Sequence, residues 1–179
     1  MSMIADVIGY FALTALVFTV LLFLKAALFK GFDFLEFQGY VADYQLLPER
    51  WVRPAAMAIV VFECLTVLTL LFEATRMIGV VLAVGLLTLY AVSMGINLKR
   101  GRSQIECGCG GVPQYLSPRL LVRNAVLMLI ALLPLAGLPQ AMSASDTLLP
   151  LLAGLFMFAM YALIEQINAN VMALQSPRL

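Results

Sequence analysis

The chain contains no histidine and only three cysteines. Without histidine it can build neither a Ser-His-Asp triad nor the usual histidine-containing metal sites. Three cysteines are also too few for a complete tetrathiolate zinc site. Any chemistry in this protein must therefore use thiols, carboxylates or a bound cofactor.

Charged residues are equally scarce. They make up 12% of the 179 residues, against 63% hydrophobic residues, whereas soluble domains average roughly 25% charged and 45–50% apolar. This composition excludes a soluble fold. The net charge of +1 and the lack of any block of like charges give no reason to expect nucleic acid as a partner. The first nine residues carry Asp6 and no basic side chain, unlike a secretory signal peptide, so we expect the first apolar segment to be kept.

What the sequence does have is long apolar runs separated by short polar segments. Their lengths of about 17 to 25 residues suit helices that cross a bilayer. The sequence therefore predicts an all-α integral membrane protein, a bundle of four to five transmembrane helices in a single domain, 1–179. The lipid bilayer is its first expected partner. The predicted spans are 7–29, 55–72, 77–98, 120–138 and 147–167.

A more polar segment follows the first predicted span. Phe34, Phe37, Val41 and Tyr44 recur there at helical spacing. This amphipathic pattern predicts a short helix that lies in the membrane interface. Pro54 is expected to open the second span, because its missing N–H is unused in a first helical turn.

Basic residues are distributed unevenly between the two sides of the predicted bundle. Lys25 and Lys30, near the end of the first span, are expected to reach the membrane surface. With five spans, only Arg76 of the eleven basic residues lies on the side of the N-terminus. The positive-inside rule therefore places the opposite side, with the loop 99–117, in the cytoplasm.

Cys107 and Cys109 flank Gly108 in the most polar stretch of the chain, residues 99–117. A disulfide between them would close a very small ring, and departure from relaxed geometry makes such a bond easier to reduce. The basic residues of 99–102 favour the reactive thiolate, and the polar loop should keep the pair accessible. The pattern favours redox exchange. Half of a metal site, or two small residues in a glycine-rich turn, are the alternatives.

Glu63 lies about ten residues into the second predicted span, on the order of 15 Å below the surface at the helical rise per residue. A carboxylate there is costly to ionise and should face the bundle, as a proton carrier or ligand contact. The alternative is a carboxyl group that joins two helices by a hydrogen bond. The adjacent Cys64 points about 100° away along the helix. It is a candidate second thiol, although a lone intramembrane cysteine usually acts as a small hydrophobe.

Five polar residues are expected to support the cysteine loop. Asn97, Arg123 and Asn124 fall at the same membrane level as the loop, and Arg102 and Glu106 lie within it. An arginine can hold backbone carbonyls or the Glu106 carboxylate, and so fix the loop in place. Ordinary topology-setting charge is the alternative for the basic residues.

Several of these segments resemble the MauE family of methylamine utilisation membrane proteins, which is related to the DoxX-type membrane families. Glu63 fits the resemblance, and the likeness extends over roughly residues 24–133. The family commonly has an aromatic residue after its second cysteine, where this chain has Gly110. The segments that carry the likeness are Tyr44-Gln45-Leu46-Leu47-Pro48, Asn97-Leu98-Lys99-Arg100-Gly101-Arg102, Glu106-Cys107-Gly108-Cys109-Gly110 and Arg123-Asn124.

The resemblance implies a protein of the bacterial inner (cytoplasmic) membrane that assists maturation of the disulfide-rich small subunit of methylamine dehydrogenase. It also implies a thioredoxin-like partner of the MauD type. We therefore expect a thiol–disulfide relay in which Cys107 and Cys109 cycle between dithiol and disulfide, with Glu63 handling protons. A quinone is a candidate electron acceptor or donor, because the apolar interior would admit its ring.

Two questions stay open at this stage. Maturation of that subunit belongs to the periplasm, whereas the basic residues place the cysteine loop in the cytoplasm. Either the fifth span is misread, or electrons cross the membrane from the cytoplasmic side. The rival function is a non-catalytic scaffold or transporter for maturation factors, with the cysteine pair structural or metal-binding. A transporter more often shows paired helix breaks in repeated halves, and no repeat is visible.

Overall fold

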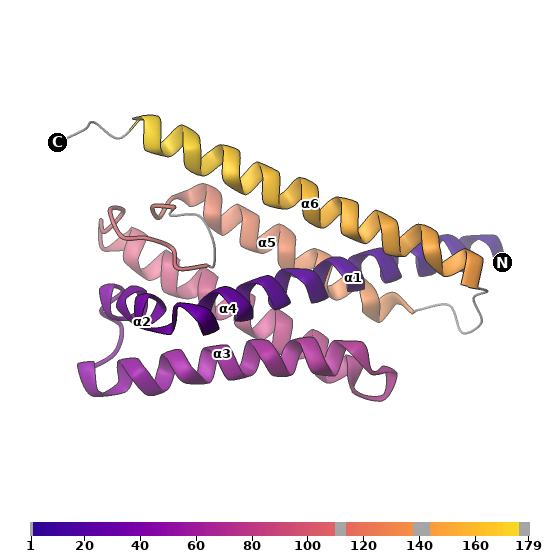
Figure 1. The fold of residues 1–179 in the computed structure, drawn as a ribbon, viewed down its shortest axis with the longest axis horizontal. Helices are drawn as coiled ribbons and strands as arrows, with labels where there is room; N and C mark the ends of the chain where they lie inside the picture. The colour runs from indigo at the N-terminus through magenta and orange to yellow at the C-terminus, as the bar shows by residue number, and fades with distance from the viewer. Residues whose placement is uncertain (1, 110–113, 138–143, 176–179) are drawn as a thin grey trace.

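The computed structural model describes residues 2–109, 114–137 and 144–175. Five long helices run along the longest axis of the molecule, with a short helix at one end (Figure 1). The predicted all-α membrane bundle is confirmed, since all five are long and apolar enough to cross a membrane. Gly110 of the cysteine motif and Leu138 of the fourth predicted span lie outside the described residues. The elements are α1 Ser2–Phe32, α2 Phe34–Asp43, α3 Glu49–Leu71, η1 Glu73–Thr75, α4 Arg76–Lys99, α5 Pro118–Leu132, η2 Leu133–Ala136 and α6 Ala144–Gln175.

The second long helix begins earlier than the sequence predicted. Pro48, with an extended backbone, precedes the first residue of α3, Glu49, and Pro54 lies inside the helix. The prediction that Pro54 opens this span is therefore wrong. Val52, only 6% exposed, packs into the bundle in the added turns. Pro54 is tolerated because it removes only one backbone hydrogen bond, close to the exposed start of the helix.

Helix α2 has ten residues, so it is about 15 Å long and could reach only halfway across a hydrocarbon core of about 30 Å. Its Phe37 is buried against the bundle, whereas Leu35 is 83% exposed. Such a helix, with one apolar side chain packed inward and another outward, suits the interface position that was predicted.

The core lies between α1, α3, α4 and α5, where large and small side chains alternate. Ala83 and Ala131 are almost fully buried beside Phe18, Phe23 and Leu86. Small residues let membrane helices approach closely. Gly154 of α6 lies against α1 in the same way, since a Cβ added to it would be 2.7 Å from the Cβ of Val17. The outer surfaces of the long helices carry exposed apolar side chains, as expected of a protein solvated by lipid.

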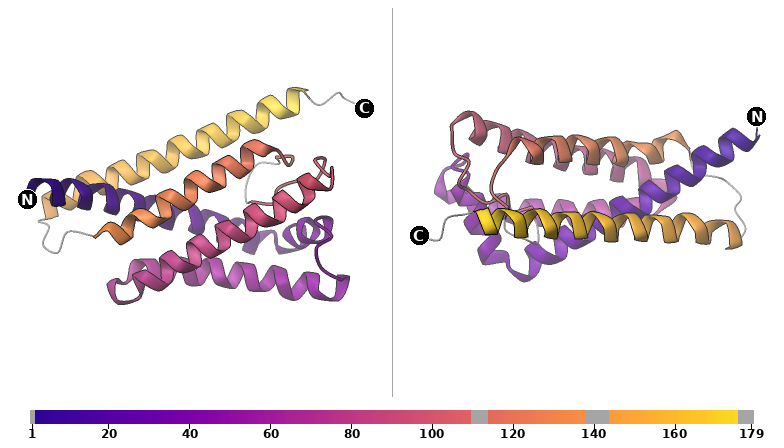
Figure 2. Two further views of the ribbon diagram at one scale, coloured as in Figure 1. Left: turned by 180° about the vertical axis from the view of Figure 1, so that it is seen from behind. Right: turned by 90° about the horizontal axis from the view of Figure 1, so that it is seen from above.

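The two ends of the bundle differ in what they carry (Figures 1 and 2). One end carries α2 and residues 100–109 and 114–117, and we call it the loop end. The other carries η1, η2 and the start of α1, and we call it the turn end. All the predicted site residues except Glu63 and Cys64 belong to the loop end or to the helix turns next to it.

Candidate functional site

A disulfide bond joins Cys107 and Cys109, whose Cα atoms are 5.3 Å apart. Gly108 between them has φ +63°, and a Cβ added to it would lie 2.9 Å from the Cβ of Tyr40 on α2. A left-handed backbone and so close a neighbour both require glycine. Glycine at position 108 therefore lets the loop that carries the disulfide pack closely against α2.

The backbone of Cys107 is held on both sides. Its N–H donates to the Gln114 carbonyl at 2.8 Å, and its own carbonyl accepts from the Tyr44 hydroxyl at 3.0 Å. Burial raises the pKa of Tyr44 above its ordinary value, so the hydroxyl keeps the proton that it donates. Cys107 is only 9% exposed, whereas Cys109 is partly exposed. The expected accessibility of the pair therefore holds for Cys109 alone.

The cation nearest to the disulfide comes from α5. The Nη2 atom of Arg123 lies 3.9 Å from the Sγ atom of Cys107. Arg100 and Arg102, which were expected to favour thiolate, donate instead to the carbonyls of Gln45 and Tyr44, at 3.4 Å and 3.5 Å. They hold the segment that follows α2, and Arg123 supplies the positive charge at the sulfur.

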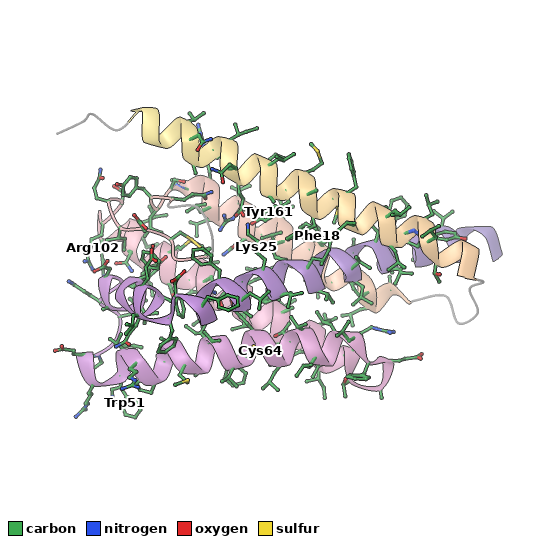
Figure 3. The ribbon with its side chains drawn as sticks, in the orientation of Figure 1. Phe18, Lys25, Trp51, Cys64, Arg102 and Tyr161 are labelled. Carbon is green, nitrogen blue, oxygen red and sulfur yellow. A yellow bond between two sulfur atoms is a disulfide. The ribbon has the colours of Figure 1, made fainter. Side chains whose placement is uncertain are left out.

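Arg123 also joins the loop to α6, through Glu165. Its Nη1 atom lies 2.7 Å from Oε1 of Glu165, which also accepts from the Tyr161 hydroxyl at 2.6 Å. Lys25 of α1 reaches Oε2 of the same carboxylate at 3.2 Å. Figure 3 shows Lys25 and Tyr161 close together between α1 and α6. Arg123 therefore binds the carboxylate of Glu165, and not that of Glu106, which was one of the two kinds of partner considered for an arginine here.

Glu63 faces the bundle, as predicted, and forms an ion pair with Lys30. Lys30 is 1% exposed and does not reach the membrane surface, which corrects the prediction for that residue. The Tyr90 hydroxyl donates to the paired oxygen of Glu63 at 2.6 Å, and Lys30 Nζ lies 4.6 Å from the Tyr90 ring centroid. Lys30 turns inward because a buried carboxylate needs a counter-charge. The second oxygen, Oε2, is buried and has no hydrogen-bond partner in the described part of the chain.

Two cavities lie on either side of Cys109 and Tyr90. The larger, of about 380 Å³, is enclosed by α2, α3, α4 and the cysteine loop, and its wall is mainly apolar and aromatic. The smaller, of about 40 Å³, has charged side chains in an otherwise largely apolar wall, among them Glu63, Arg123 and Glu165. Cys109 therefore lies between an apolar space and a smaller one that contains charged groups.

The two predicted asparagines are buried, and each donates to a backbone carbonyl. Asn97 donates to the Ser93 carbonyl at 3.2 Å and accepts from Arg102 at 3.4 Å, so it supports the loop as predicted. Asn124 donates to the Leu87 carbonyl at 3.5 Å and links α5 to α4.

Glu106 and Cys64 line neither cavity. Glu106 pairs with Tyr115 in an isolated antiparallel bridge. Burial is the main cause that raises the pKa of Tyr40 above its ordinary value. The neighbouring carboxylates of Glu36 and Glu106 raise it further. Cys64 is a free, exposed thiol on α3 that lines neither cavity (Figure 3).

Sequence reasoning missed the partners of the predicted charges. Lys30, Tyr90 and Glu165 were not assigned to the site, although each lies in or beside an apolar run. The available signal was the charge of Glu63, which at that depth demands a cation at similar depth. Lys25 lies inside the first predicted span and Lys30 directly follows it, so both were available as candidates.

The family model and the similar known proteins agree on one family. The sequence model of the family described as "Methylamine utilisation protein MauE" matches residues 8–137. A methylamine utilization protein MauE from Paracoccus denitrificans is 38% identical over 133 residues, which cover 73% of this chain and 72% of that relative. The MauE protein of Paracoccus versutus is 36% identical over 148 residues, 80% of each chain. No solved structure matches the chain significantly.

Proposed function

The chain belongs to the MauE family of methylamine utilisation proteins and has the helices of a multi-pass membrane protein, and from that premise we propose that it is a thiol–disulfide relay. The relay serves maturation of the methylamine dehydrogenase small subunit, in the bacterial inner membrane. The observation that carries the proposal is the Cys107–Cys109 disulfide beside the Arg123 guanidinium. A thioredoxin-like protein of the MauD type is the partner that exchanges with it.

The surroundings of the two sulfurs differ enough to assign their roles. Cys109 is the more exposed, so the partner's thiolate attacks its Sγ. The Cys107–Cys109 bond breaks, a Cys109–partner disulfide forms, and Cys107 leaves as a thiolate. Arg123 stabilises that thiolate, because a nearby cation favours the charged form of sulfur.

A second exchange completes the transfer. The partner's other thiolate attacks the partner's sulfur in the mixed disulfide, and Cys109 is released as a thiolate. The partner leaves as a disulfide, having lost two electrons. The relay has gained them, and Cys107 and Cys109 are now reduced. The hydrogen bonds that hold the backbone of Cys107 keep this residue in place while Cys109 moves.

Glu63 handles protons for Cys109 in this scheme. Both residues line the smaller cavity, whose volume of about 40 Å³ leaves room for one or two waters beside its charged groups. The buried Oε2 of Glu63 has no protein partner in the described residues and can accept a hydrogen bond from such a water. A proton therefore has a short path between the carboxylate and the sulfur.

Cysteine variants test the relay. The substitutions Cys107→Ser and Cys109→Ser should each abolish maturation of the small subunit while the protein still accumulates in the membrane, because the loop contributes little to helix packing. A single-cysteine partner that carries its cysteine as a mixed disulfide with thionitrobenzoate should exchange with the Cys109 thiolate of the Cys107→Ser protein, releasing thionitrobenzoate and leaving a Cys109–partner disulfide. It should not form one with Cys109→Ser, and the reverse pattern would contradict the assigned roles.

The rival function is a scaffold that recruits maturation factors without redox chemistry. The decisive variant lacks both Cys107 and Cys109. A relay loses all activity in this variant, whereas a scaffold keeps it. Full maturation of the small subunit by the double variant, at normal membrane levels, would end the redox proposal.

Labelling with a membrane-impermeant thiol reagent tests the orientation. The basic residues of the loop end predict that this end faces the cytoplasm, in which case the partner that exchanges with Cys109 is on that side and electrons cross the membrane from there. After reduction, Cys109 should react in inverted vesicles and stay protected in intact cells. Rapid labelling from outside would instead place the exchange in the periplasm.

A further inference from the structure

The larger cavity has the lining of a site for a flat apolar ring. Five aromatic side chains contribute to its wall, and its volume of about 380 Å³ falls within the usual range of ligand pockets, roughly 300–1,000 Å³. Ser93 adds a hydroxyl group that can donate a hydrogen bond to a carbonyl. The aromatic residues are Phe37, Tyr40, Tyr44, Phe62 and Tyr90.

The edge of this cavity lies among lipid-facing side chains. Phe62 of α3 and Leu89 of α4 line it and are each 46% exposed, and both belong to membrane-spanning helices. Leu47, 45% exposed, borders it closer to the membrane surface. A ligand dissolved in the bilayer can therefore enter from the side, without passing through water.

The inner wall of the cavity is the redox group itself. Cys107, Gly108 and Cys109 all line it, so a ring in the cavity contacts the residues of the disulfide. Tyr90 lines both cavities and donates to Glu63. An occupant is thus next to the sulfur atoms and one residue away from the buried ion pair.

We propose that this cavity binds the ring of a membrane-soluble quinone, which reoxidises the reduced cysteine pair. The inference rests on the proposed relay and names its electron acceptor. The S–H bonds of Cys107 and Cys109 break and the S–S bond forms. Two electrons and two protons pass to the quinone, whose carbonyl oxygens become the two hydroxyls of a quinol. The relay is then ready to oxidise the next partner.

The test uses the full chain, reduced and then freed of reductant, in nanodiscs of phosphatidylcholine that contain no quinone. Decyl-ubiquinone is added without oxygen, and free thiols and quinol absorbance are followed together. We expect one quinol for each disulfide formed. A photoreactive azido-quinone should label peptides of α2 or α3 in the wild-type protein.

Two tryptophan variants on α3 localise the reaction. Ile59 lines the cavity, whereas Val61 is 48% exposed and lines neither cavity. Ile59→Trp should slow reoxidation by decyl-ubiquinone about tenfold or more by filling the space, and Val61→Trp should change it less than about twofold. Both variants should still be reduced by a thioredoxin-like dithiol at the wild-type rate.

The outcomes separate the two proposals. If reduced thioredoxin opens the disulfide but decyl-ubiquinone never restores it, the quinone inference fails and the relay stands. If neither reaction occurs, both fail. Equal slowing in the two tryptophan variants, or labelling of α5 and α6 alone, would show that the quinone reacts elsewhere and overturn the assignment to this cavity.

Discussion

The loop end and the turn end of this bundle differ in the number of charged groups that they hold inside or beside the membrane. At the turn end, η1 and η2 connect helices of largely apolar sequence, and Arg76 is the one basic residue there. Among the described residues, a disulfide, three ion pairs and two cavities lie at the loop end or between it and the middle of the bundle. Buried charges destabilise a membrane bundle unless each has its partner. The groups that could carry chemistry are therefore gathered at and near the loop end, where they are packed beside a hydrophobic cluster that includes Cys107.

The largest effect on this comparison should come from the buried ion pair. Glu63→Gln leaves the Lys30 ammonium buried without its counter-charge, and such a change costs about 3–5 kcal/mol. We expect a lower thermal unfolding temperature in detergent and, as a consequence, much less folded protein in the membrane. Glu63→Gln alone therefore cannot test proton transfer, because a loss of activity could come from the loss of stability.

The matched control removes both charges together. Lys30→Met combined with Glu63→Gln should recover most of the stability, because a neutral pair leaves no ion unpaired. Redox turnover should stay low in the double variant if Glu63 carries protons. A double variant that is as unstable as Glu63→Gln alone would show that the ion pair is not the cause.

The second effect concerns the glycine between the two cysteines. Gly108→Ala meets two obstacles, a positive φ and the Cβ of Tyr40 at 2.9 Å. Gly101 in the same loop has φ +72° but nothing within 4 Å, so Gly101→Ala carries only the left-handed strain, about 1–2 kcal/mol. We expect partner oxidation to fall strongly for Gly108→Ala and mildly for Gly101→Ala. Equal rates would mean that contact with α2 does not matter for activity.

The third effect belongs to the turn end and should leave the chemistry unchanged. A Cβ on Gly79 would lie 2.8 Å from the backbone nitrogen of Leu70, whereas one on Gly85 meets nothing within 4 Å. Gly79→Ala should lower stability by about 1–3 kcal/mol, and Gly85→Ala should not. The disulfide of the folded protein should react at the same rate in both. A change in that rate would show that the two ends are coupled.

The smallest effect is expected from the third cysteine. Cys64 is exposed on α3 and lines neither cavity, so Cys64→Ser should alter activity by less than about twofold. The measurement is the maturation assay used for the other cysteines. A loss comparable to that of Cys109→Ser would give Cys64 a part in the relay.

The sequence predicted what depends on local pattern. Long apolar runs gave the spanning helices, and the spacing of Phe34 and Phe37 gave α2. The partners of charged residues depend on tertiary contacts between distant segments, so they were not predicted. Lys30 and its partner Glu63 are 33 residues apart in the sequence, and Arg123 and its partner Glu165 are 42 residues apart. The start of α3 was missed because Val52 packs into the bundle and extends the helix.

The pairing of Lys30 with Glu63 also has an electrical consequence. Together the two side chains carry no net charge, so the resting pair does not respond to the voltage across the bilayer. A proton that moves onto Glu63, past the middle of the 23-residue α3, carries its charge through part of that field. A full crossing corresponds to about 2.3 kcal/mol per 100 mV, and this partial one to roughly half of that. Respiring cells would then drive the relay faster or slower than de-energised ones, with the sign set by which face receives the proton.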